Sequence, residues 1–241
     1  GDCDDTADTV YPDADEICDG LDNDCDPSTL EDGITFDDGS GPTDVTSTFT
    51  GTDTSPMTWD VDTDGTYTFC TADPVYVRAT VTADVTISGS EDLRVEFDGA
   101  GRVVPFTMGS GGDLELEHAV IVDGDGSFGG GFVCDGDVAG SEAEVIFRDV
   151  EFLENNARLG GGAYFADDCG GTMERVDFID NTAGLAGGLF LLRAGTVTMT
   201  DSSFDGNVVT GDGGAFFIHG GVLDVTDTLF ENNSGSDSGG G

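Results

Sequence analysis

The first 33 residues carry the densest set of metal-ligand side chains in the sequence. Residues 1–26 contain ten Asp and one Glu and no basic residue, a density of like charge that is not expected to fold without counter-ions. Asp22, Asp24 and Asp26 are spaced at i, i+2 and i+4, as in loops that curl hard oxygen ligands around Ca²⁺. We therefore predict a calcium-binding module over residues 1–33. The expected ligands are Asp2, Asp4, Asp5, Asp8, Asp19, Asp22, Asp24, Asp26, Glu31 and Asp32.

This segment resembles a known motif. The EF-hand template does not fit, because Pro27 replaces its turn glycine and its twelfth position is Gly33. Asp-Cys-Asp-Asp at the start, followed by Glu-Ile-Cys-Asp-Gly-x-Asp-Asn-Asp-Cys-Asp, instead resembles the Mop-type metal-binding motif of secreted bacterial proteins. Ala7 and Asp8 depart from that motif, which usually has Asp and Pro at these positions.

The six cysteines favour disulfides over zinc. They contain no Cys-x-x-Cys and have no His beside them, and three of them lie among hard oxygen ligands. An even number in such a chain suggests an oxidising, extracellular compartment, although six cysteines allow fifteen pairings. The pairings that we expect are Cys3 with Cys25, Cys18 with Cys70, and Cys134 with Cys169.

The charge of the chain restricts its partners. Seven Arg and no Lys stand against 50 acidic residues, which gives a net charge of −43. Such a surface repels nucleic acid and anionic lipid; it is either neutralised by divalent cations or simply solvated. There is no apolar run of about 18 residues, so we expect no membrane span in this chain, and no signal peptide, so the sequence is expected to be processed or a fragment.

A 26-residue repeat organises the last third of the chain. Phe-x-x-Asn recurs four times at this spacing, and a glycine pair begins nine residues after each Phe. Between these marks, apolar residues alternate with polar ones, which is typical of strands with one buried face. Three short strands and three turns per repeat predict an all-β fold, a right-handed parallel β-helix of about 26 residues per coil. We expect a glycine column at positive φ, a Phe column inside, and a structural amide ladder. The ladder residues are Asn155, Asn181, Asn207 and Asn233.

These repeats resemble those of chlamydial polymorphic outer-membrane proteins and related bacterial surface β-helix proteins, which combine Phe-x-x-Asn with Gly-Gly-Ala. The resemblance covers about residues 65–241 and implies a secreted or cell-surface scaffold. We therefore divide the chain into a metal-binding module at 1–33, a linker or N-terminal cap at 34–64, and the β-helix at 65–241. Trp59 favours a packed cap over a plain linker.

A non-catalytic structural or adhesive function is our principal hypothesis, with a polysaccharide-cleaving β-helix, a lyase or glycoside hydrolase, as the alternative. The best catalytic candidate is a column of Asp167, Arg193 and His219, but two His and seven scattered Arg leave little to bind a polyanionic sugar. A charge-compensating ladder explains this column more simply. We therefore expect no enzyme.

Two surfaces are expected to make contacts. If Ala163 and Phe165 point inward, then Tyr164, Phe190 and Phe216 form an outward apolar stripe, unless a loop covers it. The sequence also stops at the glycine mark after which another strand is due. We expect either that the parent chain continues into further coils, or that the end is covered by head-to-tail self-association into a filament or by a surface partner, and we favour such an assembly or a tandem array over a monomer.

Overall fold

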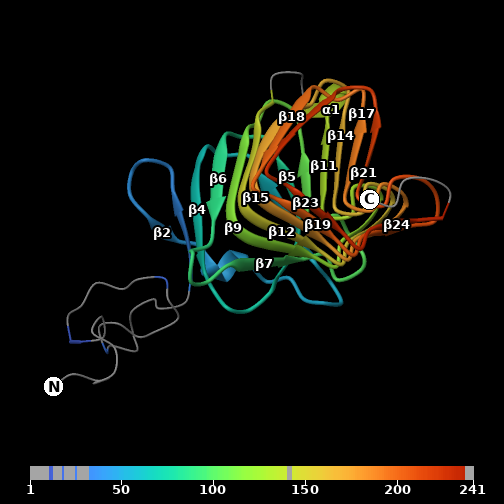
Figure 1. Cartoon of the computed structure of the whole chain (residues 1–241). Coiled ribbons are helices and arrows are strands. Elements are labelled where there is room, and N and C mark those ends of the chain that lie inside the picture. The colour runs from blue at the N-terminus through green and yellow to red at the C-terminus, as the bar shows by residue number, and fades with distance from the viewer. Residues whose placement is uncertain (1–10, 13–17, 19–24, 26–32, 140–142, 237–241) are drawn as a thin grey trace.

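The computed structural model describes residues 11–12, 18, 25, 33–139 and 143–236, and this part of the chain is nearly all β. Its strands stack in successive coils, as in a solenoid (Figure 1). The described helices are the 3₁₀ turn η1 (Thr46–Thr48) and α1 (Gly136–Ala139), and neither is long and apolar enough to cross a membrane.

The described strands lie in three groups, which we call sheets A, B and C; sheets A and B are joined by hydrogen bonds through β5, whereas sheet C is separate. Sheet A comprises β1 (Gly33–Asp37), β2 (Thr43–Asp44), β4 (Gly65–Cys70), β6 (Val85–Ser88), β7 (Val95–Asp98), β9 (Leu114–Val122), β12 (Val145–Leu153), β15 (Gly171–Ile179), β18 (Thr196–Thr200), β19 (Ser203–Asp205), β22 (Val222–Thr226) and β23 (Leu229–Glu231). Sheet B comprises β3 (Met57–Val61), β5 (Val75–Val81), β8 (Phe106–Met108), β11 (Phe132–Asp135), β14 (Ala163–Ala166), β17 (Leu189–Leu192) and β21 (Phe216–His219). Sheet C comprises β10 (Asp125–Phe128), β13 (Asn156–Leu159), β16 (Thr182–Leu185), β20 (Val208–Val209) and β24 (Ser234–Gly235).

Pairing between coils is parallel and in constant register. In sheet A, Phe152 lies opposite Phe178, and Phe178 lies opposite Phe204, each 26 residues further on. The step from β9 to β12 is longer, because an insertion that includes α1 lies between them. β3 falls within the predicted cap at 34–64, yet it pairs in parallel with β5, so the parallel pairing begins at Met57 rather than at Gly65.

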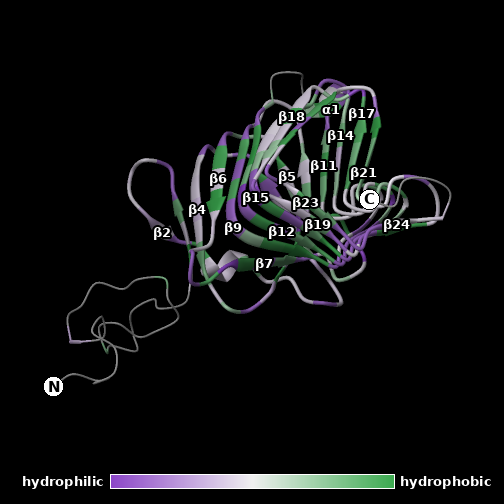
Figure 2. Ribbon diagram, viewed as in Figure 1, coloured by the Kyte–Doolittle hydropathy of each residue, from purple (hydrophilic) through white to green (hydrophobic). Residues whose placement is uncertain are grey.

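Side chains of like kind stack along the axis. The rings of Phe152, Phe178 and Phe204 lie 4.8 and 4.7 Å apart, nearly parallel and fully buried. Hydrophobic residues alternate with hydrophilic ones along the strands (Figure 2), which follows from the period of two in the sequence. Each coil therefore closes one layer of a continuous core.

The Asn ladder lies where the chain leaves sheet A for sheet C, and its members are buried except the last. Asn181 Nδ2 donates to Asn207 Oδ1 at 3.0 Å and to the Phe152 carbonyl at 2.8 Å. Its Oδ1 accepts from the backbone N–H and from Nδ2 of Asn155. The same bonds join Asn207 to Asn233. Each side-chain amide thus satisfies a backbone N–H and a backbone carbonyl of the preceding coil at a buried bend, and its Nδ2 also donates to the amide of the next coil.

The pairs Gly161-Gly162 and Gly187-Gly188 allow close approach and do not supply positive φ, which corrects the sequence-based expectation for these two coils; Gly213 of the next pair does have positive φ, at 77°. A Cβ on Gly161 would lie inside van der Waals contact with the carbonyl oxygen of Gly187, and one on Gly162 would lie 2.6 Å from the Phe178 ring. The left-handed turn falls one residue earlier, at Gly160, and at Ala186 in the next coil. The Phe and Gly-Gly motifs recur at the same spacing because the second glycine of each of these pairs packs against the Phe ring of the next repeat, as Gly162 does against Phe178 and Gly188 against Phe204.

Replacing Asn181 by Ala is expected to lower the free energy of unfolding by about 3 kcal/mol, because it removes the partner of two buried backbone groups, the Asn155 N–H and the Phe152 carbonyl, at about 1–3 kcal/mol each. Urea denaturation followed by circular dichroism measures this loss. Asn156→Ala is the matched control: this neighbouring amide is exposed and bonds only side chains, so we expect about 0.5 kcal/mol or less. Equal losses in the two variants would contradict the structural role of the ladder.

Candidate functional site

The ten acidic residues expected to bind metal all lie outside the described residues, as does the predicted pairing of Cys3 with Cys25. The structure does show how this segment joins the solenoid. A disulfide links Cys18 to Cys70 at the end of β4, as predicted, with their Cα atoms 5.3 Å apart. Ser90 also donates its hydroxyl to the Cys18 carbonyl at 2.8 Å. The metal-binding motif is therefore tethered to the first coils.

The second described disulfide joins Cys134 in β11 to Cys169 just after β14, also as predicted. Both cysteines are fully buried and belong to the main hydrophobic core. This disulfide links neighbouring coils. Because Cys134 lies two residues before α1, the disulfide also anchors the start of the insertion to the core.

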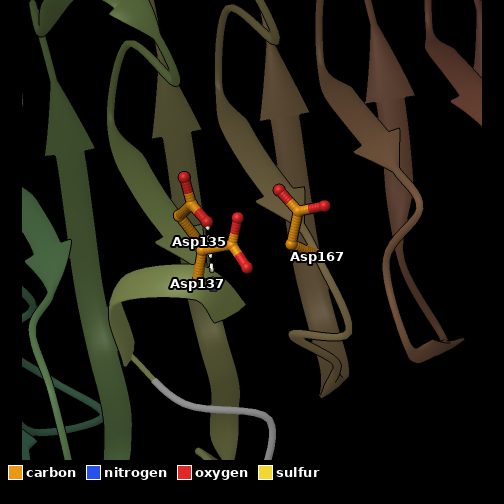
Figure 3. Close-up of side chains that lie close together, drawn as sticks. All are labelled: Asp135, Asp137 and Asp167. Atoms are coloured by element: carbon orange, nitrogen blue, oxygen red, sulfur yellow. Dashed lines mark hydrogen bonds between the residues drawn. The ribbon is translucent and has the colours of Figure 1, made fainter.

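Three carboxylates meet beside this disulfide: Asp135 at the end of β11, Asp137 in α1 and Asp167 just after β14 (Figure 3). One oxygen of each lies within 4.8 Å of the others, close enough to share a hard cation. The Asp137 backbone N–H donates to Asp135 Oδ1 at 3.0 Å. Because Asp167 is also paired with Arg193, part of this charge is already neutralised without a metal, and the cluster does not by itself define a cation site.

The column of Asp167, Arg193 and His219 is only partly assembled. Arg193 forms an ion pair with Asp167, as a charge-compensating ladder requires. His219 lies opposite Leu192 and is exposed, so it stands one position out of register with Arg193. Asp167, Arg193 and His219 therefore do not line up as one column of three functional groups.

The aromatic stripe differs from the sequence-based expectation in membership and in exposure. Tyr164 lies opposite Phe190, but Phe190 lies opposite Phe217, with ring centroids 5.7 and 5.4 Å apart. Phe216 instead lies opposite Leu189 and packs against the main core. The reason is a 27-residue step between β17 and β21, whereas the preceding step, from β14 to β17, uses 26.

Sheet C covers this stripe. Leu159 of β13 and Leu185 of β16 pack against Tyr164 and Phe190, which are each only 4% exposed and form a second hydrophobic cluster. Burial raises the pKa of the Tyr164 phenol, with smaller contributions from Asp135 and Asp167. The stripe is therefore a second core between sheets B and C rather than an open contact surface.

The outer face of sheet A carries ion pairs that the sequence analysis missed. Arg148 pairs with Glu115 and Glu117 of the preceding coil and with Glu174 of the next. Arg175 donates to both carboxylate oxygens of Asp149, at 2.7 and 2.8 Å. The 26-residue spacing from Arg148 to Glu174 and from Asp149 to Arg175 was the available signal, because residues so spaced lie on adjacent coils.

Comparison with protein families found two matches. Residues 2–30 match a Cu-binding MopE family described as "Putative metal-binding motif", and residues 201–219 match the Chlamydia polymorphic membrane protein repeat. Both matches agree with the resemblances seen in the sequence. Comparison with curated proteins and with solved structures found no match. The two family matches cover separate parts of the chain, an acidic metal-binding motif and a surface-protein repeat.

Asp149→Asn is expected to lower the free energy of unfolding at pH 7 by about 0.5–1 kcal/mol, because it removes a surface ion pair. The Arg175 hydrogen bonds hold the pKa of Asp149 below its usual value of about 3.9. This stabilisation is thus present above that value and is lost as pH falls through the lower folded-state pKa. The difference between wild type and variant in urea denaturation should shrink as pH falls below about 3.9 and vanish once Asp149 is protonated in the folded state as well.

Asp201→Asn is the matched control for this titration. Asp201 occupies the equivalent left-handed turn two coils further on and forms no ion pair with the described part of the chain. Its variant should differ little from wild type at any pH. A loss in Asp149→Asn that persists unchanged in acid would exclude the ion pair as its cause.

Proposed function

We propose that this chain is a secreted or cell-surface right-handed parallel β-helix that serves adhesion or extracellular structure without catalysis, and that its N-terminal segment binds Ca²⁺. The observation that carries the proposal is the constant parallel register between coils, with Phe and Asn columns at its centre. Parallel strands joined by crossovers are almost always right-handed, which supports the hand. The disulfides and the match to a membrane-protein repeat support an extracellular or surface location.

The donor set favours calcium over copper at the N-terminal motif, although the name of the matching family refers to copper. Copper prefers imidazole, thiolate and thioether ligands, and residues 1–33 contain no His and no Met. Cys18 and Cys25 are disulfide-bonded, so neither offers a thiolate. What remains is a dense set of carboxylates, which suits Ca²⁺. Bound there, the ion would neutralise charge that otherwise opposes an ordered segment.

The arrangement of residues gives less support to the alternative, a polysaccharide-cleaving enzyme. Arg193 is engaged by Asp167, and His219 lies out of register with both. A catalytic site needs an acid or base and an electrostatic partner aimed at one substrate position. Incubation with polygalacturonate and with neutral polysaccharides tests the choice, and turnover abolished by Asp167→Asn would overturn the non-catalytic proposal.

Calcium binding is tested by metal analysis and by titration calorimetry of the 241-residue chain with Ca²⁺ and with Cu²⁺. We expect Ca²⁺ to bind, and the double variant D24N/D26N to weaken binding by about tenfold or more, since it removes two charged ligands. D60N/D62N is the matched control, because these carboxylates have the same i, i+2 spacing but lie exposed in and beside β3. Its binding should equal that of wild type.

Chelation gives a second readout of the same site. Excess chelator is expected to speed proteolysis within residues 1–33 and to leave the solenoid intact, because the coils are held by hydrogen bonds and apolar columns. Mass spectrometry of the fragments locates the cleavage. An unchanged fragment pattern, or Cu²⁺ bound in preference to Ca²⁺, would contradict the calcium proposal.

A further inference from the structure

A pocket lies at the N-terminal end of the solenoid, where three segments that are far apart in the sequence meet. They are the start of β1 at residues 33–34, the turn η1 with the residues that follow it up to Gly51, and residues 71–76, which lead from β4 into β5. The cavity has a volume of about 250 Å³. A cavity of about 150 Å³ holds benzene in another protein, so this one has room for a ligand somewhat larger than a benzene ring.

Contacts within the first coils hold the walls of the pocket in place. The ring of Phe49 packs edge-on against Trp59 and Phe69, with ring centroids 5.0 and 5.2 Å apart. Thr46 Oγ1 accepts the backbone N–H of Ile34 at 2.8 Å, which joins η1 to β1. Because none of these contacts involves a ligand, the pocket is formed before one binds, and little conformational entropy is lost on binding.

The lining combines apolar surface with a single charge. Ile34 and Val75 are 3% and 6% exposed, and together with Phe49 they supply the apolar part. Asp73 is exposed, and its carboxylate forms no ion pair and accepts no hydrogen bond within the described part of the chain. None of the described lining residues is basic. The carboxylate of Asp73 is therefore available to a positively charged ligand.

Further carboxylates lie around Tyr76, which also lines the pocket. Asp98 of β7 lies opposite Tyr76 of β5. Burial, followed by the charges of Asp98, Asp53, Glu96 and Asp73, raises the pKa of the Tyr76 phenol. The electrostatic potential at this side chain is thus negative and favours a positive group. An aromatic ring such as that of Tyr76 also attracts an ammonium group through its π face.

We propose that this pocket binds a small organic cation, an amine with a compact apolar body and one ammonium group. The body packs against Ile34, Phe49 and Val75 and is removed from water there, while the ammonium group pairs with Asp73. An anion of the same shape would meet only like charge. A metal ion would find one carboxylate beside an apolar wall, which is too few oxygen ligands for Ca²⁺. The site is therefore distinct from the N-terminal metal-binding motif, and the proposal does not rest on that motif.

Three probes of similar size separate the effect of charge from that of apolar contact: benzylamine, benzyl alcohol and benzoate. Trp59, the single Trp of the chain, packs on Phe49, so its fluorescence reports occupancy of the pocket. The titrations use about 0.15 M salt, which screens charges more than about 8 Å away. We expect saturable binding of benzylamine, about fivefold tighter than that of benzyl alcohol, as for an exposed ion pair at the upper end of its usual range. Benzoate should not bind.

Asp73→Asn removes the proposed ion pair and should weaken benzylamine binding about fivefold while leaving benzyl alcohol binding unchanged. The replaced side chain is exposed, so the circular dichroism spectrum should be unchanged as well. Asp224→Asn is the matched control. It removes the same charge from an exposed position in β22, in the last described coil of sheet A, and should affect neither probe.

Amide chemical-shift mapping locates the bound amine. The largest shifts on adding benzylamine should fall on Ile34, Val75 and Tyr76, which line the pocket. The absence of saturable binding, equal affinities for benzylamine and benzyl alcohol, or equal effects of Asp73→Asn and Asp224→Asn would each overturn the proposal. So would shifts that are largest outside the pocket, because these would show that the amine binds the acidic surface in general.

Discussion

The fold depends on a close backbone contact between adjacent coils. It lies where the chain of each coil leaves sheet A for its strand in sheet C and then returns towards sheet B. Gly130, Gly161 and Gly187 each lie against the carbonyl of the glycine in the next coil, with no room for a side chain. The chain departs beside Asn155, whose Oδ1 accepts the Gly124 N–H at 2.9 Å, and it returns through Gly130 and Gly131. The amide ladder and the glycine column therefore lie on two sides of one narrow gap, and together they hold the strands of sheet A from β12 onward at a 26-residue spacing.

This gap explains where the chain accepts change. The insertion that includes α1 lies outside it and adds residues without disturbing the pairing of β9 with β12. The 27-residue step before β21 likewise shifts one strand of sheet B, while β22 keeps its 26-residue spacing to β18. The 26-residue spacing also places opposite charges on adjacent coils. Arg148 and Arg175 pair with carboxylates of neighbouring coils on the outer face of sheet A. Arg148, Arg175 and Arg193, three of the seven arginines of this strongly acidic chain, thus pair with carboxylates of neighbouring coils.

Much of this architecture could be predicted from the sequence, because a constant period carries three-dimensional information. The spacing of Asn155, Asn181 and Asn207 was enough to predict a ladder. It was not enough to show that Gly161-Gly162 and Gly187-Gly188 serve close contact rather than positive φ, since that depends on the path of the chain through sheet C. Phe216 was placed in the wrong column because a single added residue is invisible when glycines alone are aligned. The burial of Tyr164 was missed because nothing local indicates that Leu159 and Leu185 fold back over it.

Amide hydrogen exchange of Asn155, Asn181 and Asn207 tests most directly the claim that the buried ladder fixes the stack. Each of these backbone N–H groups donates to the side-chain oxygen of the next Asn, at 3.0 or 3.1 Å. The account predicts that Asn155 and Asn181 exchange among the slowest amides of the chain, through global unfolding only, and that Asn207, whose acceptor Asn233 is only half-buried, exchanges faster. Exchange of Asn181 at the rate of an exposed loop amide would contradict it.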